Sequence, residues 1–219
     1  SLNLLRAADE AAFFLSGAGG HPLSEPETAG RFASRESDAA DMRSIEEFLD
    51  EALITEVLNV IRSGKEATVY RCKAHRSLGA TFAAAKVYHS SGHRSFHSAA
   101  GYEAGRHFGP GQVQRAVARR TGFGQEARLS AWVGREFDLL SALNYAGADV
   151  PAPYACTDAA ILMEYVGDAA GPAPQLQHAD LDPEDAQPLF DRVLENIELL
   201  LRANVVHGDL SAFNILYNA

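Results

Sequence analysis

The 219-residue sequence predicts an α+β fold in which a strand-rich part precedes a part that is mainly helical. Short apolar segments between residues 54 and 88 are typical of strands, whereas residues 126–143 and 183–203 carry apolar side chains at helical spacing. Breaks rich in Gly and Pro near residues 150–153 and 167–174 divide the chain further. Strands and helices that occupy separate stretches of the chain favour the α+β class over the α/β class, in which strands and helices alternate.

The first 40 residues are predicted to form a disordered tail. Residues 16–40 are rich in Gly, Ser, Pro, Glu and Ala and show no apolar periodicity. A helix is predicted from Ser44 onward, because Ser44 and Glu47 have the spacing of a capping box. The apolar residues at helical spacing behind this cap are Ile45, Phe48, Leu49, Ala52 and Leu53.

Three strands are predicted next, over residues 54–61, 67–72 and 82–88, with a Gly-containing turn between the first two. Residues 89–125 are rich in Gly, Ser, His and Arg and predict a long loop, which is usually functional or disordered. Residues 126–143 then form an amphipathic helix.

The second half of the chain opens with a break at residues 150–153, followed by a short apolar strand at residues 160–166 and a linker at residues 167–174. The last helix is expected to run to about residue 203. Its start follows Asp182, because Asp suits an N-cap and Pro183 suits the first helical position.

Charge and cysteine content restrict the classes of function. Asp and Glu number 29 against 19 Lys and Arg, and the net charge of −10 argues against broad binding to nucleic acid. Cys72 and Cys156 show no CxxC spacing, which argues against a disulfide framework or a zinc site and indicates a reducing, cytoplasmic compartment. No stretch reaches the roughly 18 apolar residues of a membrane span, and the first residues do not resemble a signal peptide.

The chain closes on a segment with the chemistry of phosphoryl transfer, from His207 through Asp209 to Asn214. Such a site needs an Asp to accept the proton of the attacking hydroxyl and a downstream Asn to hold a metal ion. Asp209 and Asn214 have this spacing, with Gly208 in the place of an Arg. The same template requires a second metal-binding Asp, which the sequence up to residue 219 does not supply.

A nucleotide site is indicated more weakly by the turn at residues 61–69 and by Lys86. Gly64 and Val69 match a Gly-rich phosphate loop, although a turn of this composition is more often a plain hairpin. Lys86 lies in an apolar strand, where a lysine is unfavourable unless it is paired or reaches solvent. Glu136 lies near the expected buried face of the following helix and is a candidate partner, the other interpretation being a solvated glutamate.

Taken in order, these segments resemble the RIO family of atypical protein kinases, most closely its type-1 branch. The resemblance covers about residues 45–219. The segments that carry it are residues 63–70 (SGKEATVY, similar to SGKEANVY), 85–88 (AKVY, similar to LKIY), Trp132 with Glu136 (WxxxE), 163–167 with 172–174 (hinge and PAP turn) and 206–214 (the HxDLSxxN loop).

The resemblance implies a two-lobed, protein-kinase-like fold, with an antiparallel-sheet N-lobe that includes a helix and a partial helical C-lobe. The implied division places the N-lobe at residues 41–166, including the flexible loop 89–125. Residues 167–219 are then the hinge linker and the start of the C-lobe with the catalytic loop, and the end of that lobe is missing.

The resemblance also implies roles for individual residues. Asp209 is the catalytic base, Lys86 and Glu136 form the catalytic ion pair, and Asn214 binds Mg²⁺. The residues implied to bind ATP are Ser63, Gly64, Lys65, Val69, Lys86, Met163, Glu164 and Val166.

The implied function is an ATP- and Mg²⁺-dependent serine/threonine kinase or ATPase. The γ-phosphoryl group would pass to a serine hydroxyl of a protein substrate, to a serine of the chain itself, or to water. The family is associated with maturation of the small ribosomal subunit, so pre-ribosomal RNA and protein are expected partners and a membrane is not.

Two other functions fit the catalytic segment. Small-molecule kinases of the aminoglycoside or choline type also use an HGDxxxxN loop, but the SGKEA loop and the spacing of Trp132 and Glu136 favour the RIO family. A chain that lacks the second metal-binding Asp would instead bind nucleotide with little turnover, because losing one stabilising group typically lowers the rate by roughly 10²–10³.

The loop at residues 89–125 carries a basic cluster within an acidic chain. One interpretation is a solvated mobile loop, and the other is a contact with RNA phosphates or an acidic substrate, since Arg suits phosphate. Serines of this loop are candidate autophosphorylation sites. The residues concerned are Arg94, Arg106, Arg115, Arg119 and Arg120, and Ser90, Ser91, Ser95 and Ser98.

Overall fold

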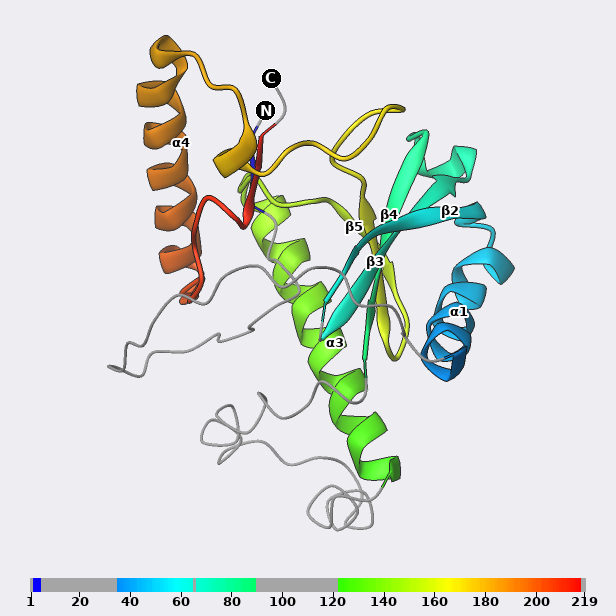
Figure 1. The fold of residues 1–219 in the computed structure, drawn as a ribbon. Coiled ribbons are helices and arrows are strands. Elements are labelled where there is room, and N and C mark those ends of the chain that lie inside the picture. The colour runs from blue at the N-terminus through cyan, green and yellow to red at the C-terminus, as the bar shows by residue number, and fades with distance from the viewer. Residues whose placement is uncertain (1, 5–34, 65, 90–121, 218–219) are drawn as a thin grey trace.

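The structure, a computed structural model, describes residues 2–4, 35–64, 66–89 and 122–217. Its centre is an antiparallel sheet of five strands in the order β2-β3-β4-β6-β5 (Figure 1). The strands are β2 (Ile54–Ser63), β3 (Ala67–Ala74), β4 (Phe82–Tyr88), β5 (Pro153–Cys156) and β6 (Ala160–Glu164). The predicted strands between residues 54 and 88, and the one that begins at residue 160, are therefore confirmed.

Two helices, α1 (Arg35–Asp50) and α3 (Gly122–Tyr145), cover opposite faces of this sheet. Phe48 of α1 and Val133 of α3 are both fully buried, one in the core cluster on each face. Because successive side chains of a strand point to opposite faces, β4 divides between the two clusters. Ala83, Ala85 and Val87 lie on the α1 side, and Ala84 and Tyr88 lie on the α3 side.

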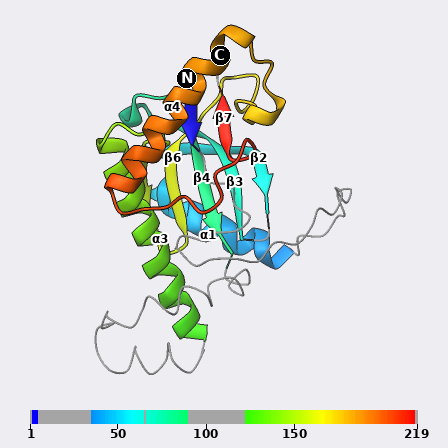
Figure 2. The same cartoon turned by 90° about the vertical axis from the view of Figure 1, so that its left-hand side faces the viewer.

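The C-terminal part is built on α4 (Pro183–Arg202), after which the chain passes through the loop at residues 203–214 into β7 (Ile215–Tyr217). β7 pairs with β1 (Leu2–Leu4), so the two ends of the described chain lie side by side (Figure 2). Short 3-10 helices, η1 (Arg76–Leu78) and η5 (Leu176–His178), lie in connections. A third core cluster joins the end of α3 to α4 and β7, and its buried members are Leu143, Ala148, Val150, Leu200 and Ile215.

The start of α1 differs from the prediction. The helix begins at Arg35 rather than after Ser44, which lies inside it, so the predicted capping box is wrong. The part of α1 that lies in the predicted tail contains good helix formers such as Glu36 and Ala40. The next residue, Asp41, has a buried carboxylate that accepts a hydrogen bond from the Tyr70 hydroxyl, a contact that no local pattern could show.

Other boundaries also differ. Helix α3 begins at Gly122 rather than at residue 126, and β6 ends at Glu164 rather than at residue 166. Strand β5 was predicted as a break because of its prolines, but Pro153 begins an edge strand, where a missing N–H is tolerated. Residues 2–4, placed in the predicted tail, form a strand.

Several predictions concern residues outside the described ranges. These are the remainder of the tail at residues 5–34, Lys65, and the arginines and serines of the basic loop within residues 90–121. Among the described helices, none is both long enough and apolar enough to cross a membrane.

Candidate functional site

A cavity lies between the sheet and the C-terminal part of the chain. The sheet contributes Val69, Ala84 and Lys86, and the segment after β6 contributes Val166. Residues from α3, α4 and the last loop, including Glu136, Leu200 and His207, line the other side. Most residues that line the cavity are apolar, which suits a flat ligand such as a nucleobase. The charged side chains of Lys86 and Glu136 lie together on this lining.

Lys86 and Glu136 form a buried ion pair on this wall. Lys86 Nζ lies 2.9 Å from Glu136 Oε1, and the side chains are only 7% and 10% exposed. Tyr88, two residues along β4 on the same face, donates its hydroxyl to the same oxygen at 2.7 Å. Trp132 lies one turn before Glu136 on α3 and packs edge-on against the Tyr88 ring. A buried lysine charge needs such partners. The expected contact between Lys86 and Glu136 is present, and the role of the pair in binding nucleotide stays a prediction.

The turn between β2 and β3 lies beyond this pair. Val69 lines the cavity, as expected for a nucleotide site, but Ser63 and Gly64 are not among the lining residues. Ser63 pairs with Thr68 across the turn, and their hydroxyl oxygens are 3.3 Å apart. Thr68 is on the α1 face of the sheet, because it alternates with Val69. The Ser63 side chain is therefore directed away from the cavity, and the Gly64 N–H donates to the Ala67 carbonyl.

The segment after β6 connects the two parts of the molecule. Met163 and Glu164 end strand β6, and Val166 follows it. All three residues line the cavity, and Met163 is buried. The Val166 carbonyl accepts a hydrogen bond from the Ala173 N–H at 3.0 Å, which folds residues 167–172 into a tight turn. Asp168 closes this turn by accepting bonds from the N–H groups of Ala170 and Gly171.

The last loop brings the predicted phosphotransfer residues together. Asn214 is buried and donates its side-chain amide to the Asp209 carboxylate at 2.6 Å and to the Asp209 carbonyl at 2.8 Å. Its own N–H donates to the Ser211 carbonyl, so the loop is closed by its own residues. Asp209 does not line the cavity itself, but His207 in the same loop and Leu216 of β7 do.

A family model described as the RIO domain matches residues 57–219. The chain belongs to the RIO family. The match begins within β2 and covers both the Lys86–Glu136 pair and the loop with Asp209 and Asn214. The resemblance that the sequence motifs indicated is thereby confirmed.

Similar proteins include curated RIO kinases of archaea and eukaryotes. The chain is 31% identical over 166 residues to the RIO-type serine/threonine-protein kinase Rio1 of Methanocaldococcus jannaschii, covering 74% of this chain and 51% of that protein. It is 30% identical over 173 residues to the serine/threonine-protein kinase rio1 of Schizosaccharomyces pombe, covering 78% and 32%. The human serine/threonine-protein kinase RIO1 is 28% identical over 202 residues, covering 84% and 33%. The chain thus spans a third to a half of the length of these relatives.

A solved structure of the same fold is the Rio2 kinase of Chaetomium thermophilum in an ADP/Mg²⁺–phosphoaspartate complex. It superposes with a TM-score of 0.55 at 23% identity, over 81% of this chain and 46% of that one. The predicted α+β, kinase-like fold is therefore confirmed. We refer to the sheet with α1 and α3 as the N-lobe, and to α4 with the last loop as the C-lobe side of the molecule; the predicted domain bounds stay a prediction.

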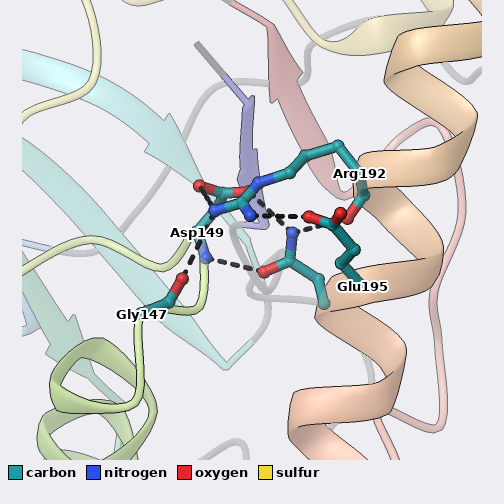
Figure 3. Close-up of polar contacts among 5 residues, drawn as sticks. Gly147, Asp149, Arg192 and Glu195 are labelled. Atoms are coloured by element: carbon teal, nitrogen blue, oxygen red, sulfur yellow. Dashed lines mark hydrogen bonds and ion pairs between the residues drawn. The ribbon is translucent and has the colours of Figure 1, made fainter.

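A polar cluster that the motifs did not reveal ties α4 to the turn after α3 (Figure 3). Asp149 accepts two bonds from the Arg192 guanidinium, at 2.6 and 2.8 Å, and one from the Asn196 amide at 2.6 Å. The Asp149 N–H in turn donates to the Asn196 side-chain oxygen, and Arg192 also reaches Glu195 and the Gly147 carbonyl. The hydrogen bonds to Asp149, and to a smaller extent the one to Glu195, raise the pKa of Arg192 above its ordinary value.

Neither cysteine belongs to the site. Cys72 is buried under α1, and this burial raises the pKa of its thiol to about 12, so it stays protonated and unreactive at neutral pH. Burial also raises the pKa of the Cys156 thiol, with smaller effects from Asp138 and Asp158. In the ranges that the structure describes, no cluster of three or more His, Cys, Asp or Glu side chains could hold a metal ion.

Proposed function

We propose that this chain carries the nucleotide-binding and catalytic residues of an ATP-dependent serine/threonine kinase. The observation that carries the proposal is the buried Lys86–Glu136 pair, which lines the same cavity as Met163 and Val166. In kinases a lysine held by a helix glutamate binds the α- and β-phosphates of ATP. The names of the similar proteins support the same activity.

The cavity suggests how ATP would lie. The adenine would occupy the apolar space between Val69, Ala84 and Met163, next to the main-chain groups of Glu164 and Val166. This places the phosphates toward Lys86, whose charge is held in position by Glu136. Since the Ser63 hydroxyl is directed to Thr68 and the Gly64 N–H donates to the Ala67 carbonyl, the turn would contact phosphate through other main-chain N–H groups, as anion-binding turns commonly do.

Asp209 is the proposed catalytic base. Its carboxylate accepts the proton of a serine hydroxyl while the hydroxyl oxygen forms a bond to the γ-phosphorus. The bond from that phosphorus to the β,γ-bridging oxygen breaks, and ADP leaves. If water replaces the serine, the same bond changes amount to ATP hydrolysis. Asn214 orients the Asp209 carboxylate through the 2.6 Å hydrogen bond.

The residues of this loop fit a role in binding Mg²⁺. The Asn214 amide nitrogen is committed to Asp209, which leaves its amide oxygen, a hard ligand of the kind that Mg²⁺ prefers. Asn214 is the proposed protein ligand, and bound Mg²⁺ would neutralise negative charge on the phosphates.

Substrate, partners and location are proposals that rest on family membership. The acceptor is a serine of a protein substrate or of the chain itself. Pre-ribosomal RNA and protein are the proposed partners, and the cytoplasm is the proposed location.

The proposal is tested with the Asp209→Asn variant. Loss of the base should lower transfer of the ATP γ-phosphate, to a serine peptide or to the chain itself, by roughly 10²-fold or more. ATP affinity should change little, because Asp209 does not line the cavity. Lys86→Met should weaken both ATP binding and transfer. Radiolabel transfer and calorimetric titration with Mg-ATP measure the two effects.

A matched control is Asp180→Asn, which removes an exposed carboxylate upstream of α4 and should leave both measurements unchanged. Full activity in the Asp209→Asn variant would refute the assignment of the base. Binding of ATP without turnover by the unaltered chain would indicate a nucleotide-binding module. Transfer to aminoglycosides or choline in preference to the peptide would indicate a small-molecule kinase.

A further inference from the structure

A chain of polar contacts lies behind the β2–β3 turn, on the face of the sheet covered by α1. Asp41 of α1 accepts a hydrogen bond from the Tyr70 hydroxyl at 3.0 Å and lies 3.6 Å from His89 Nε2. The same nitrogen is 2.9 Å from Thr68 Oγ1, which is in turn 3.3 Å from Ser63 Oγ. Asp41 and Thr68 are only 6% and 5% exposed, so the centre of this network is buried, whereas Ser63 forms its exposed end.

The donors and acceptors of this network are set by the tautomer of His89. With a hydrogen on Nε2, His89 donates to Thr68 Oγ1 at 2.9 Å, and the same nitrogen lies 3.6 Å from the Asp41 carboxylate. Thr68 Oγ1 can then donate its own hydrogen to Ser63 Oγ. The contacts are compatible with one another, and hydrogen bonds in such a chain strengthen each other.

The network holds both arms of the turn. Ser63 is the last residue of β2, and Thr68 is the second residue of β3. The main-chain N–H of His89 also donates to the Glu66 carbonyl at 2.7 Å. The residue that follows β4 therefore contacts the turn itself. Three parts of the chain that are far apart in sequence, α1, the turn and the end of β4, are thus connected at one place.

We propose that Thr68, His89 and Asp41 are positioning residues for the phosphate groups of the nucleotide. They hold the turn from its rear face, so that its main chain is ordered before the ligand arrives. A turn that is already ordered loses less conformational entropy on binding. The inference rests on the proposed nucleotide function, and it assigns to α1 a part in that function.

A nearly isosteric variant, Thr68→Val, tests the inference. Valine keeps the β-branched shape of the residue and removes only the hydroxyl. Titration of the chain with ATP, ADP and adenosine, with Mg²⁺ present, should show that ATP and ADP bind about five- to tenfold more weakly. Adenosine binding should stay within about twofold, because the adenine end of the cavity is untouched. Thr68→Ser, which restores a hydroxyl, should recover the affinity of the unaltered chain.

Two further variants complete the test. Thr55→Val removes a threonine hydroxyl at the other end of the same strand pair, where it bonds the Lys73 carbonyl, and should change no affinity. Asp41→Asn acts at the start of the network and should weaken ATP and ADP in the same way as Thr68→Val.

The outcomes separate the two proposals. If the unaltered chain binds none of the three ligands, the proposed function itself is wrong. If it binds them and the Thr68 and Asp41 variants bind ATP and ADP equally well, the positioning role is wrong. Equal weakening of all three ligands would also overturn it, since a general loss of structure would act on adenosine too.

Discussion

Gly167 is a residue whose lack of a side chain shapes the hinge. Its φ angle is +151°, a conformation that other residues rarely adopt. A Cβ atom here would lie 2.4 Å from the Gly171 carbonyl oxygen and 2.7 Å from Pro172 Cα. Both neighbours are main-chain atoms of the turn that the Val166–Ala173 hydrogen bond closes, so neither can rotate away.

We therefore expect Gly167→Ala to open this turn and to displace the main chain of the hinge. The strain should lower the free energy of unfolding by roughly 1–3 kcal/mol. Because this turn borders the part of the cavity where we propose that adenine binds, adenosine and ATP should both bind more weakly. Urea denaturation and titration with the two ligands measure these effects.

The control for this variant is Gly134→Ala in helix α3. Apart from the backbone of α3 itself, no atom of the described residues lies within 4 Å of the Cβ that would be added there. Alanine is the better helix former, so this variant should be more stable by about 0.4–1 kcal/mol and bind adenosine normally. Normal stability and binding in the Gly167→Ala variant would show that the turn can relax.

The residues of the site differ in how well the sequence predicted them. Lys86, Glu136, Asp209 and Asn214 belong to short motifs whose spacing reflects local chemistry, and the structure places each pair in contact. The Ser63 hydroxyl was expected to face phosphate, but strand alternation directs it to Thr68. Contacts such as those of Asp41 with Tyr70 and His89 join distant parts of the chain, and no sequence pattern reports them.

At the level of elements, the attachment of α4 to the turn after α3 depends more on Asn196 than on Arg192. Asn196 is fully buried and bonds both the N–H and the carboxylate of Asp149. The Arg192 side chain is 42% exposed, so water screens its ion pair. Removing a partner from a buried polar group costs more than breaking a partly exposed ion pair.

Asn196→Ala should accordingly lower the free energy of unfolding by roughly 1–3 kcal/mol. Arg192→Ala should lower it by about 1 kcal/mol or less. The measurement is the urea midpoint of each variant, compared with that of the unaltered chain.

Arg202→Ala serves as the control on the same helix. Arg202 pairs with Glu198 at the surface, with side chains 70% and 62% exposed, and the change should stay within about 0.5 kcal/mol. A larger effect for Arg192→Ala than for Asn196→Ala would contradict the assignment of the buried amide as the main link.

The elements were predicted where a regular pattern is long enough. Strands β2 to β4 and helices α3 and α4 have clear apolar periodicity, and their bounds agree to within a few residues. Strands β1 and β7 have three residues each and exist through pairing with one another, so neither has a pattern of its own. Helix α1 begins before its predicted cap, and Asp41, in this early part, makes a tertiary contact with Tyr70 that has no local sequence pattern.

At the scale of the whole molecule, one apolar cluster joins the two lobes. Leu143 and Val150 from the N-lobe side pack with Leu200 of α4 and Ile215 of β7. We therefore expect the lobes to unfold together. The single tryptophan, Trp132, lies on α3 against the Tyr88 ring, so its fluorescence reports on the N-lobe.

Leu200→Ala tests this coupling from the C-lobe. Leu200 is 5% exposed, and its truncation should lower the free energy of unfolding by about 2–5 kcal/mol. The Trp132 signal should shift to lower urea by this full amount, although Trp132 lies in the other lobe.

The neighbouring residue supplies the control. Leu201 is 56% exposed, so Leu201→Ala should change stability by about 0.5 kcal/mol or less. An unchanged Trp132 transition in the Leu200→Ala variant, with loss of helix seen by circular dichroism, would show that the lobes unfold independently.

The pairing of β1 with β7 also determines how the folded chain responds to mechanical force. Leu2 pairs with Tyr217 and Leu4 with Ile215, so the two ends leave the ladder on the same side. Tension applied between the ends would load the hydrogen bonds between β1 and β7 one after another, beginning at the Leu2–Tyr217 pair, and not all at once in shear. β7 begins directly after Asn214, so weak pulling would loosen the loop at residues 203–214 before it strained the five-stranded sheet.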